Sequence, residues 1–320
     1  MKKLMTVLVM MLVLSLACTA FAAEAYPSRT IEFVVPFGAG GSADIFARSF
    51  AELLAKKLDV NVNVVNKAGA GGVTGLAHSE DQDADGYTIC LVTPSMPIAE
   101  AKGTYAFNEK FQPVALMEED IYVISVLNTN PYFTDWDGFV KYAQENSGYV
   151  TTGGSGSGSL DEYTSLQIGE QIGAELVYVP YDGYGEYKAA FLGGEVDLYV
   201  DKLSSFTQMA QYEEIIPMAV TTTARVPAAG LDDVPTMIEL GYDFTVGSWR
   251  GIVVREETPA EIVDILRQAS KEIYDSPEFQ EVLARDNANL VDAYRDAPAF
   301  QELIDSAVAK YTEIVANYSK

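Results

Sequence analysis

The sequence has two cysteines, one histidine and only 21 basic side chains among 320 residues. Cys90 is the one cysteine outside the N-terminal segment, so no internal disulfide is expected, and its apolar neighbours Ile89 and Leu91 predict a buried thiol. With His78 as the single histidine, no partners for a His-based triad are placed around it, and no Cys/His cluster predicts a metal site. We therefore expect a protein without cofactor or resident metal.

Basic residues are outnumbered by 46 acidic ones, which gives a formal net charge of −25. Such a surface repels nucleic acid and anionic membranes, so neither is an expected partner, and most of the excess is explained as a solubilising surface. The 48% of hydrophobic residues is typical of a globular protein. Because single cores stop growing at about 250–300 residues, the length predicts two domains.

The N-terminus has the pattern of a secretory signal peptide over residues 1–22. Lys2 and Lys3 precede the apolar segment 4–17, which is short for a membrane span, and small residues follow around Ala22. Cys18 leaves lipoprotein anchoring as an alternative, although the residues before it lack the expected aliphatic side chain. In either case the sequence predicts export.

Three predicted strands each end in a loop rich in glycine or hydroxyl groups. The first strand begins at Ile31, and its loop leads into a helix that ends near Leu58. The free N–H groups and the dipole of such a helix start favour an anion. If the strands are parallel, the loops share the edge where open α/β sheets bind ligands. These loops are 38–42, 66–75 and 93–95.

A second strand and helix series begins near Ile121. Its strand 149–152 enters the run 153–159, which alone would be a flexible linker but between a strand and the helix 160–172 favours a ligand loop. Near the C-terminus, the capping patterns at Thr258 and Ser276 predict structural helices.

Seven segments in this order carry a family resemblance: IEFVVPFGAGGSAD, NKAGAGGVTG, DGYTI, the GSGS loop, VPYDGYGEYKAAFLGGEVDLYVD, Arg225 with DDVPTMIELGYDF, and WRGIVV with TPAEIV. Together they resemble the substrate-binding proteins of tripartite tricarboxylate transporters, the Bug family, over nearly the whole mature chain.

The resemblance implies an α/β, two-lobe type II periplasmic binding protein fold (Venus flytrap) with the ligand cleft between the lobes. Residues 26–120 and 221–320 would form lobe I, and residues 121–220 lobe II. The implied protein is a monomeric periplasmic solute receptor without catalysis. It would bind a di- or tricarboxylate, an aromatic carboxylate or an acidic amino acid, and would deliver it to the membrane subunits of such a transporter.

The same resemblance implies the ligand contacts. Glycine serves there because backbone N–H groups approach a ligand closely only without a Cβ in the way. Asp44 has two interpretations, contact with a ligand amino group or a helix-start residue that satisfies its own backbone. Lobe I would contribute Phe37, Gly40, Gly41, Ser42, Asp44, Ala70, Gly71, Gly72, Thr93 and Ser95, and lobe II would contribute Ser155, Gly156, Ser157, Gly158, Ser159, Asp182 and Asp201.

Two positions depart from the family pattern. Glu162 and Tyr163 stand where the family often has His-Leu, and a carboxylate there would repel an anion unless it faces away. Arg250 stands where an uncharged residue is common. It is either a bidentate clamp for a ligand carboxylate or a surface arginine that pairs with this acidic protein.

Two motifs and one role compete with this interpretation. The spacing of Gly38, Gly40 and Ala43 is a loose dinucleotide fingerprint of an oxidoreductase, but Asn66 stands where the ribose-binding acid is required. The run 81–86 opens like a calcium loop whose twelfth position would be Val92 rather than Glu. The alternative without catalysis is a ligand-sensing periplasmic partner of a signalling protein.

Overall fold

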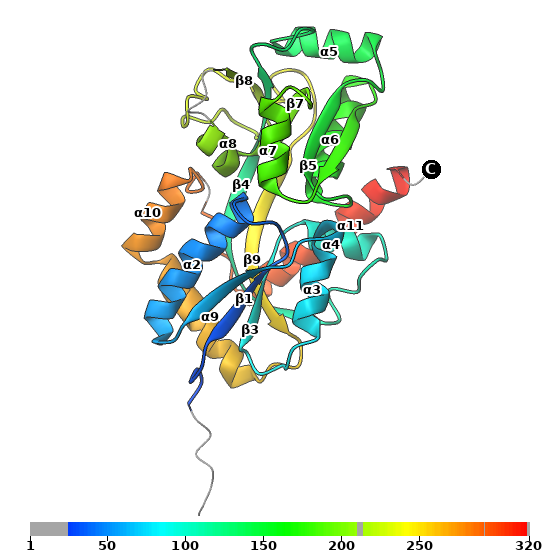
Figure 1. Ribbon diagram of the computed structural model, residues 1–320. Helices are drawn as coiled ribbons and strands as arrows, with labels where there is room; N and C mark the ends of the chain where they lie inside the picture. The colour runs from blue at the N-terminus through cyan, green and yellow to red at the C-terminus, as the bar shows by residue number, and fades with distance from the viewer. Residues whose placement is uncertain (1–24, 210–213, 291, 319–320) are drawn as a thin grey trace, which may run out of the picture.

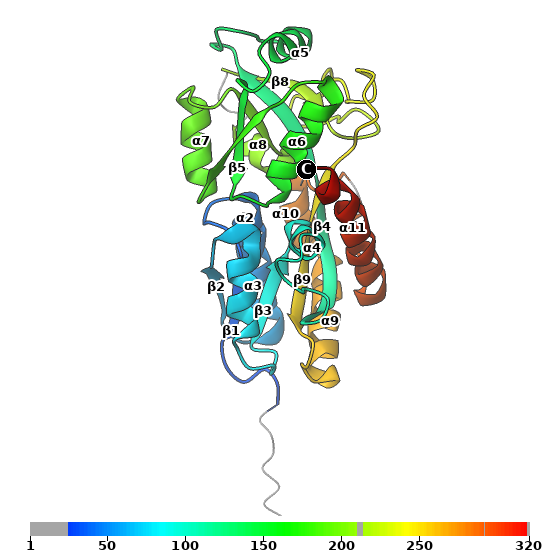
Figure 2. The same ribbon diagram turned by 90° about the vertical axis from the view of Figure 1, so that its right-hand side faces the viewer.

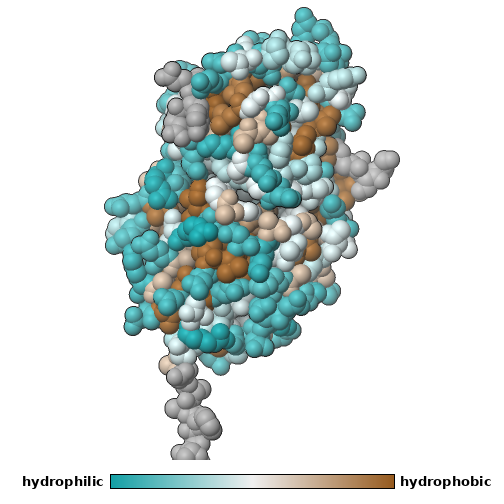
Figure 3. All heavy atoms as spheres, viewed as in Figure 1, coloured by the Kyte–Doolittle hydropathy of each residue, from teal (hydrophilic) through white to brown (hydrophobic). Residues whose placement is uncertain are grey.

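The computed structural model describes residues 25–209, 214–290 and 292–318. The expected signal peptide, residues 1–22 with Cys18, lies outside the described residues. Two α/β lobes stand one above the other, joined by long strands (Figure 1). Within the described ranges, no helix has the length and apolar character needed to cross a membrane. Hydrophilic side chains dominate the face in Figure 3, as the acidic composition leads one to expect.

Lobe I is built on the three strands that the sequence predicts, and in the structure they are parallel. The strand β1 (Ile31–Val35) lies between β2 (Val62–Asn66) and β3 (Thr88–Val92) and is parallel to both. The strand β9 (Gly247–Arg255) is antiparallel to β3, and it pairs in turn with the first part of β4 (Phe111–Leu127). The loops after β1, β2 and β3 therefore meet at one edge of the sheet.

Alternating side chains of β1 explain why helices cover both faces of this sheet. Phe33 and Val35 pack into one core with α2 (Ser42–Leu58), α9 (Ala260–Tyr274) and α10 (Pro277–Arg285). Val34 packs into the other core with α3 (Val73–Glu80), α4 (Ser95–Ala101) and α11 (Ala297–Tyr318). Cys90 is buried in that second core as predicted, and burial raises the pKa of its thiol to about 12.

Lobe II is a second small sheet that shares β4 with the first. The strands β7 (Leu198–Lys202) and β8 (Ile215–Val220) are antiparallel to the second part of β4. The strand β5 (Thr151–Ser155) is parallel to β7 and to β6 (Val177–Tyr181). One core holds α5 (Trp136–Glu145) and α6 (Leu160–Ile172), and the other holds α7 (Tyr184–Leu192) and α8 (Leu203–Met209) (Figure 2).

The boundary expected at residue 221 lies further along the chain in the structure. Val226, Leu231 and Val234 pack into a core of lobe II, because after β8 the chain continues over that lobe before it returns. The crossing back to lobe I is β9, which begins at Gly247. The helix α11 also touches both lobes, because Phe300 packs in lobe I while Tyr311 packs in a core of lobe II.

Of the two capping patterns predicted for the C-terminal helices, the structure has one and lacks the other. The Ser276 side chain accepts a hydrogen bond from the Phe279 amide at 3.3 Å and caps α10 as predicted. Thr258 is not the N-cap of α9; Pro259 occupies that position, and no side chain caps the helix. Both helices pack on lobe I, so they support the site without lining it.

Candidate ligand site between the lobes

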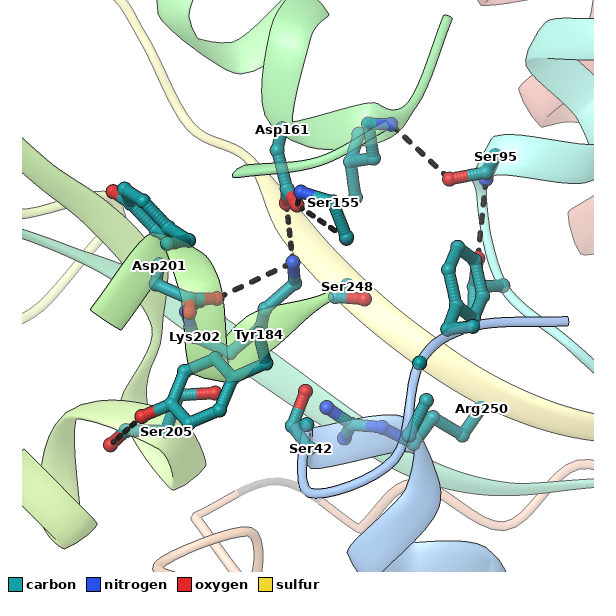
Figure 4. Close-up of a pocket in the computed structure, with 17 residues that line it drawn as sticks. Ser42, Ser95, Ser155, Asp161, Tyr184, Asp201, Lys202, Ser205, Ser248 and Arg250 are labelled. Atoms are coloured by element: carbon teal, nitrogen blue, oxygen red, sulfur yellow. Dashed lines mark hydrogen bonds and ion pairs between the residues drawn. The ribbon is translucent and has the colours of Figure 1, made fainter. Parts of the chain in front are cut away.

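A cavity lies between the two lobes, where the loops after β1 and β3 face lobe II (Figure 4). It encloses about 590 Å³ of space not filled by atoms, part of it open to solvent. Residues of both lobes and of the crossover strand β9 line it. A ligand in this cavity would therefore contact both lobes at once.

The N-terminus of α2 forms the lobe I side of this cavity. Gly41 is its N-cap residue and makes no side-chain capping bond, while Ser42 lies in the cavity wall beside it. The first amides of a helix have no carbonyl partner within that helix, and its dipole favours negative charge there. With 17 residues, α2 presents these donors to any anion in the cavity.

Asp44, in the first turn of α2, is turned away from this cavity. Its carboxylate accepts bonds from the Gly40 amide at 2.9 Å, from Arg48 at 2.9 Å and from Asn66 at 2.9 Å. Burial raises the pKa of Asp44, but the bonds from Arg48, Gly40 and Asn66 outweigh it and hold that pKa below its usual value. These contacts are those of a helix-start residue, with all partners inside lobe I.

The lobes touch directly at the edge of the cavity. The Ser95 hydroxyl oxygen on α4 accepts a hydrogen bond from the Leu160 amide at the start of α6, at 3.1 Å. A second bond joins the lobes further out, where the Asn287 side chain donates to the Thr207 hydroxyl at 3.0 Å. The structure therefore has its cleft closed.

A buried lysine held by two aspartates forms the lobe II wall. The Lys202 ammonium lies between Asp161, to which it bonds directly, and Asp201 at 3.3 Å (Figure 4). Burial works against the charge of Lys202, but the two carboxylates raise its pKa. Burial also raises the pKa of Asp201, whereas Lys202 and the hydroxyl of Tyr122 keep that of Asp161 below its usual value.

Arg250 lies in the cavity wall beside Ser42 and is only 1% exposed, so the surface-arginine interpretation is wrong. Its guanidinium pairs directly with Glu118 and lies 3.4 Å from Asp120. Both acids sit on β4, in the stretch that pairs with β9 where the two strands cross between the lobes. Burial raises the pKa of Asp120 to about 7, although Ser204 donates to it.

Ser205, in the first turn of α8, contributes a buried hydroxyl group to the wall of the cavity. It is 1% exposed, and its hydroxyl has no hydrogen-bond partner among the described residues. Leaving a buried hydroxyl unpaired costs about 1–3 kcal/mol. Because Ser205 lines the cavity, this hydroxyl is a candidate donor to a ligand oxygen that reaches it.

The glycine-serine loop after β5 satisfies most of its own donors. Glu162 accepts bonds from the Gly158 amide and from the Ser157 hydroxyl, and Ser159 caps α6 through the Glu162 amide. The carboxylate of Glu162 thus closes its own loop and does not line the cavity between the lobes. Gly158 and the glycine loop of lobe I come so close that a Cβ on Gly71 would lie 3.1 Å from the Gly158 backbone.

Two further hollows adjoin the cleft. The first, at the rim between the two glycine loops, encloses about 1,060 Å³ and includes Gly71, Gly156 and Asp182 in its wall. The second is a groove between β9 and α11 on the hinge side, with Thr221, Ser248 and Tyr311 in its wall. We call these the rim hollow and the hinge groove.

The ligand-contact residues expected from the sequence, Arg250 included, fall into three groups. The wall of the cavity holds Phe37, Gly41, Ser42, Thr93, Ser95, Ser155, Asp201 and Arg250. The rim hollow holds Ala70, Gly71, Gly72, Gly156, Ser157 and Asp182, and it shares Phe37 and Ser155 with the cavity. Neither wall includes Gly40, Asp44, Gly158 or Ser159.

Sequence reasoning missed six polar side chains of the cavity wall. They come from the helix starts and strand ends of lobe II and from β9. The sequence alone offers one signal for two of them, since Lys202 and Ser205 follow closely after Asp201, a residue already expected to contact the ligand. The missed residues are Asp161, Tyr184, Tyr187, Lys202, Ser205 and Ser248.

Comparisons with known proteins point to a single family of transporter receptors. The family described as "Tripartite tricarboxylate transporter family receptor" matches residues 46–319. A protein of Agrobacterium vitis from the TAR-I ttuE-ttuC′ intergenic region is 32% identical over 264 residues, which cover 81% of this chain and 75% of that protein.

Two solved structures extend this likeness to three dimensions. The periplasmic binding protein BugD superposes with a TM-score of 0.84 at 30% identity, over 91% of this chain and 98% of its own. A Rhodopseudomonas palustris protein solved with adipate superposes with a TM-score of 0.83 at 25% identity, over 91% and 97% of the two chains. The two-lobe fold is therefore confirmed.

Proposed function

Since this chain belongs to the tripartite tricarboxylate transporter receptor family, we propose that it binds a small organic carboxylate in the cavity between its lobes and delivers it to membrane subunits of that transporter type. It acts in the periplasm as a solute receptor and catalyses no reaction. The adipate carried by the R. palustris relative supports a carboxylate as the ligand class.

One observation carries the proposal: the buried Ser205 hydroxyl, unpaired among the described residues, lines a cavity that also receives the N-terminus of α2. A ligand carboxylate would accept bonds from the first amides of α2 and from Ser42 on the lobe I side. Ser205 would donate from the lobe II side. A ligand bound in this way bridges the lobes and favours the closed arrangement.

Closure gives the transporter something to recognise. The bonds Ser95 to Leu160 and Asn287 to Thr207 cross the cleft, and they can form only when the lobes meet. A membrane partner that contacts both lobes together would distinguish loaded from empty receptor.

The test begins with purified protein freed of ligand by unfolding and refolding. Its thermal midpoint is measured against mono-, di- and tricarboxylates, aromatic acids, amino acids and nicotinamide dinucleotides. A ligand at about 100 times its dissociation constant adds about 2.7 kcal/mol, enough for a clear shift. Stabilisation by an acid is expected; stabilisation by dinucleotides alone would contradict the proposal.

The delivery step needs its own experiment. Receptor and radiolabelled ligand are added to the solution outside vesicles that contain the cognate membrane subunits. Uptake of the ligand into the vesicles is compared with and without receptor. Uptake that depends on the receptor is expected. Equal uptake without it would refute delivery and leave the sensing role.

A further inference from the structure

The charges around the cavity do not balance. Its wall contains two cations, and each of them is already paired with two carboxylates: Lys202 with Asp161 and Asp201, and Arg250 with Glu118 and Asp120. On the lobe II side two acids therefore face one base, while on the other side burial raises the pKa of Asp120 to about 7 and leaves Arg250 chiefly with Glu118. A dicarboxylate would add two more negative charges to this excess.

Among the described residues that line the cavity, no cation lacks a carboxylate partner. The positive charge needed to neutralise a dianion is thus not supplied by the protein. Backbone amides of α2 and the hydroxyls of Ser42 and Ser205 can hold one carboxylate without a formal charge. They do not offset the negative charge on the lobe II side.

Asp201 is the acid that has room for a ligand donor. The four lone-pair positions of Asp161 are taken by Tyr122, Lys202, the Ser155 amide and the Ser155 hydroxyl. Asp201 accepts from the Lys202 amide at 2.7 Å, from the Lys202 ammonium at 3.3 Å and from Tyr199 at 3.0 Å. One position of about four remains, on a carboxylate that lines the cavity.

Resting on the proposed function, we infer that the ligand is a zwitterion: an amino-bearing carboxylic acid whose ammonium group donates to Asp201 while its carboxylate is held by the start of α2 and by Ser205. The ammonium supplies the missing positive charge on the lobe II side. Buried carboxylates are stable as ions when such a partner is present, and burial makes this partner selective. Asp201 is thereby the residue that separates amino acids from hydroxy acids.

Matched ligand pairs test this directly. L-aspartate is compared with L-malate, and 2-aminoadipate with adipate, by isothermal titration of the ligand-free protein. Within each pair the two acids differ only at the carbon that bears the amino group, where malate has a hydroxyl and adipate has hydrogen. The amino-bearing member is expected to bind at least about tenfold tighter. If malate and adipate bind as tightly as their amino counterparts, the inference is wrong and the ligand is a plain carboxylate.

The variant Asp201→Asn gives a prediction with opposite signs for the two ligand types. It keeps the size of the side chain and removes the charge, so the amino acid should lose affinity by about tenfold or more while the plain acid binds equally well or tighter. Asp232→Asn, which removes an exposed carboxylate outside the cavity, is the charge control and should change neither. A parallel loss for both ligand types would assign Asp201 a structural role and overturn the inference.

Different results would refute the amino-bearing ligand and the carboxylate receptor. The comparison of pairs in the unmodified protein stands even if Asp201→Asn does not fold. Binding of acids without preference for the amino group refutes the zwitterion and leaves the receptor. If none of the four acids binds, the inference of an amino-bearing ligand is wrong for these acids, and the proposal of a carboxylate receptor is weakened as well.

Discussion

Gly38 offers the sharpest test of closure, because its missing side chain is what lets the lobes meet. A Cβ added there would lie 2.9 Å from the Gly183 Cα and 3.2 Å from the Asp182 carbonyl oxygen, both on lobe II. Ordinary contacts begin at about 3.4 Å, and backbone atoms cannot turn aside as a side chain can. Gly38→Ala therefore destabilises the closed state. It should not affect an open state, because there the two lobes are apart and this contact is not made.

The expected magnitude follows from the cost of overpacking. Forcing one methyl group into a filled space costs about 1–3 kcal/mol. If ligand binds tightly only to the closed form, that cost appears in the apparent affinity, which should fall by about 5- to 150-fold. The thermal midpoint of the ligand-free variant should stay close to that of the unmodified protein, because neither lobe is disturbed internally.

Gly183→Ala is the matched control. Gly183 lies opposite Gly38, yet a Cβ on it would meet nothing within 4 Å, and its backbone conformation is open to other residues. Titration calorimetry with the best acid should find its affinity unchanged. If Gly38→Ala binds as tightly as Gly183→Ala, the ligand-bound state is not the closed arrangement described here.

Three further predictions follow from the buried polar groups. Ser205→Ala should weaken acid binding by about tenfold or more in calorimetry while leaving the unfolding free energy of the ligand-free protein unchanged or higher, since the lost hydroxyl bonds no described residue; a drop in stability with unaltered affinity would contradict this. Lys202→Met leaves Asp161 and Asp201 without their cation and should cost about 3–5 kcal/mol in urea unfolding, whereas Lys141→Met on the exposed face of α5 should cost little; equal effects would refute the buried triad. Burial raises the pKa of Asp120 to about 7 in the folded protein, so the folded state binds this proton more tightly than the unfolded chain does. The unfolding free energy of the unmodified protein minus that of Asp120→Asn should therefore fall as pH rises from about 4 to 7. If this difference is flat or rises over that window, Arg250 keeps Asp120 ionised.

The strands, the helix starts and the glycine loops of lobe I were predictable because each leaves a local pattern. Ile31–Val35 is apolar except for Glu32, and the helix after Gly41 has its apolar side chains on one face. Parallel pairing then brings the loops to one edge, as β1, β2 and β3 show. Residues 160–172 also form the predicted helix without a shift of either end.

Charged residues of the cavity wall were harder to predict, since their positions depend on contacts far apart in the chain. Lys202 reaches Asp161 across 41 positions, and Arg250 meets Asp120 across 130. No local pattern shows that such a residue is buried, and an arginine in an acidic protein is ordinarily a surface residue. The lobe boundary near residue 221 was misplaced for a similar reason, because Val226 and Leu231 reveal their core only once β4 and β8 are paired.

The most direct test of the account is a crystal structure of the protein with the acid that stabilises it most. Ligand density should fill the cavity between the lobes, with a carboxylate oxygen within hydrogen-bond distance of the Ser205 hydroxyl and of the first amides of α2. The Ser95 to Leu160 bond should be present in the same structure. Ligand bound in the rim hollow or the hinge groove, with Ser205 still unpaired, would contradict the account.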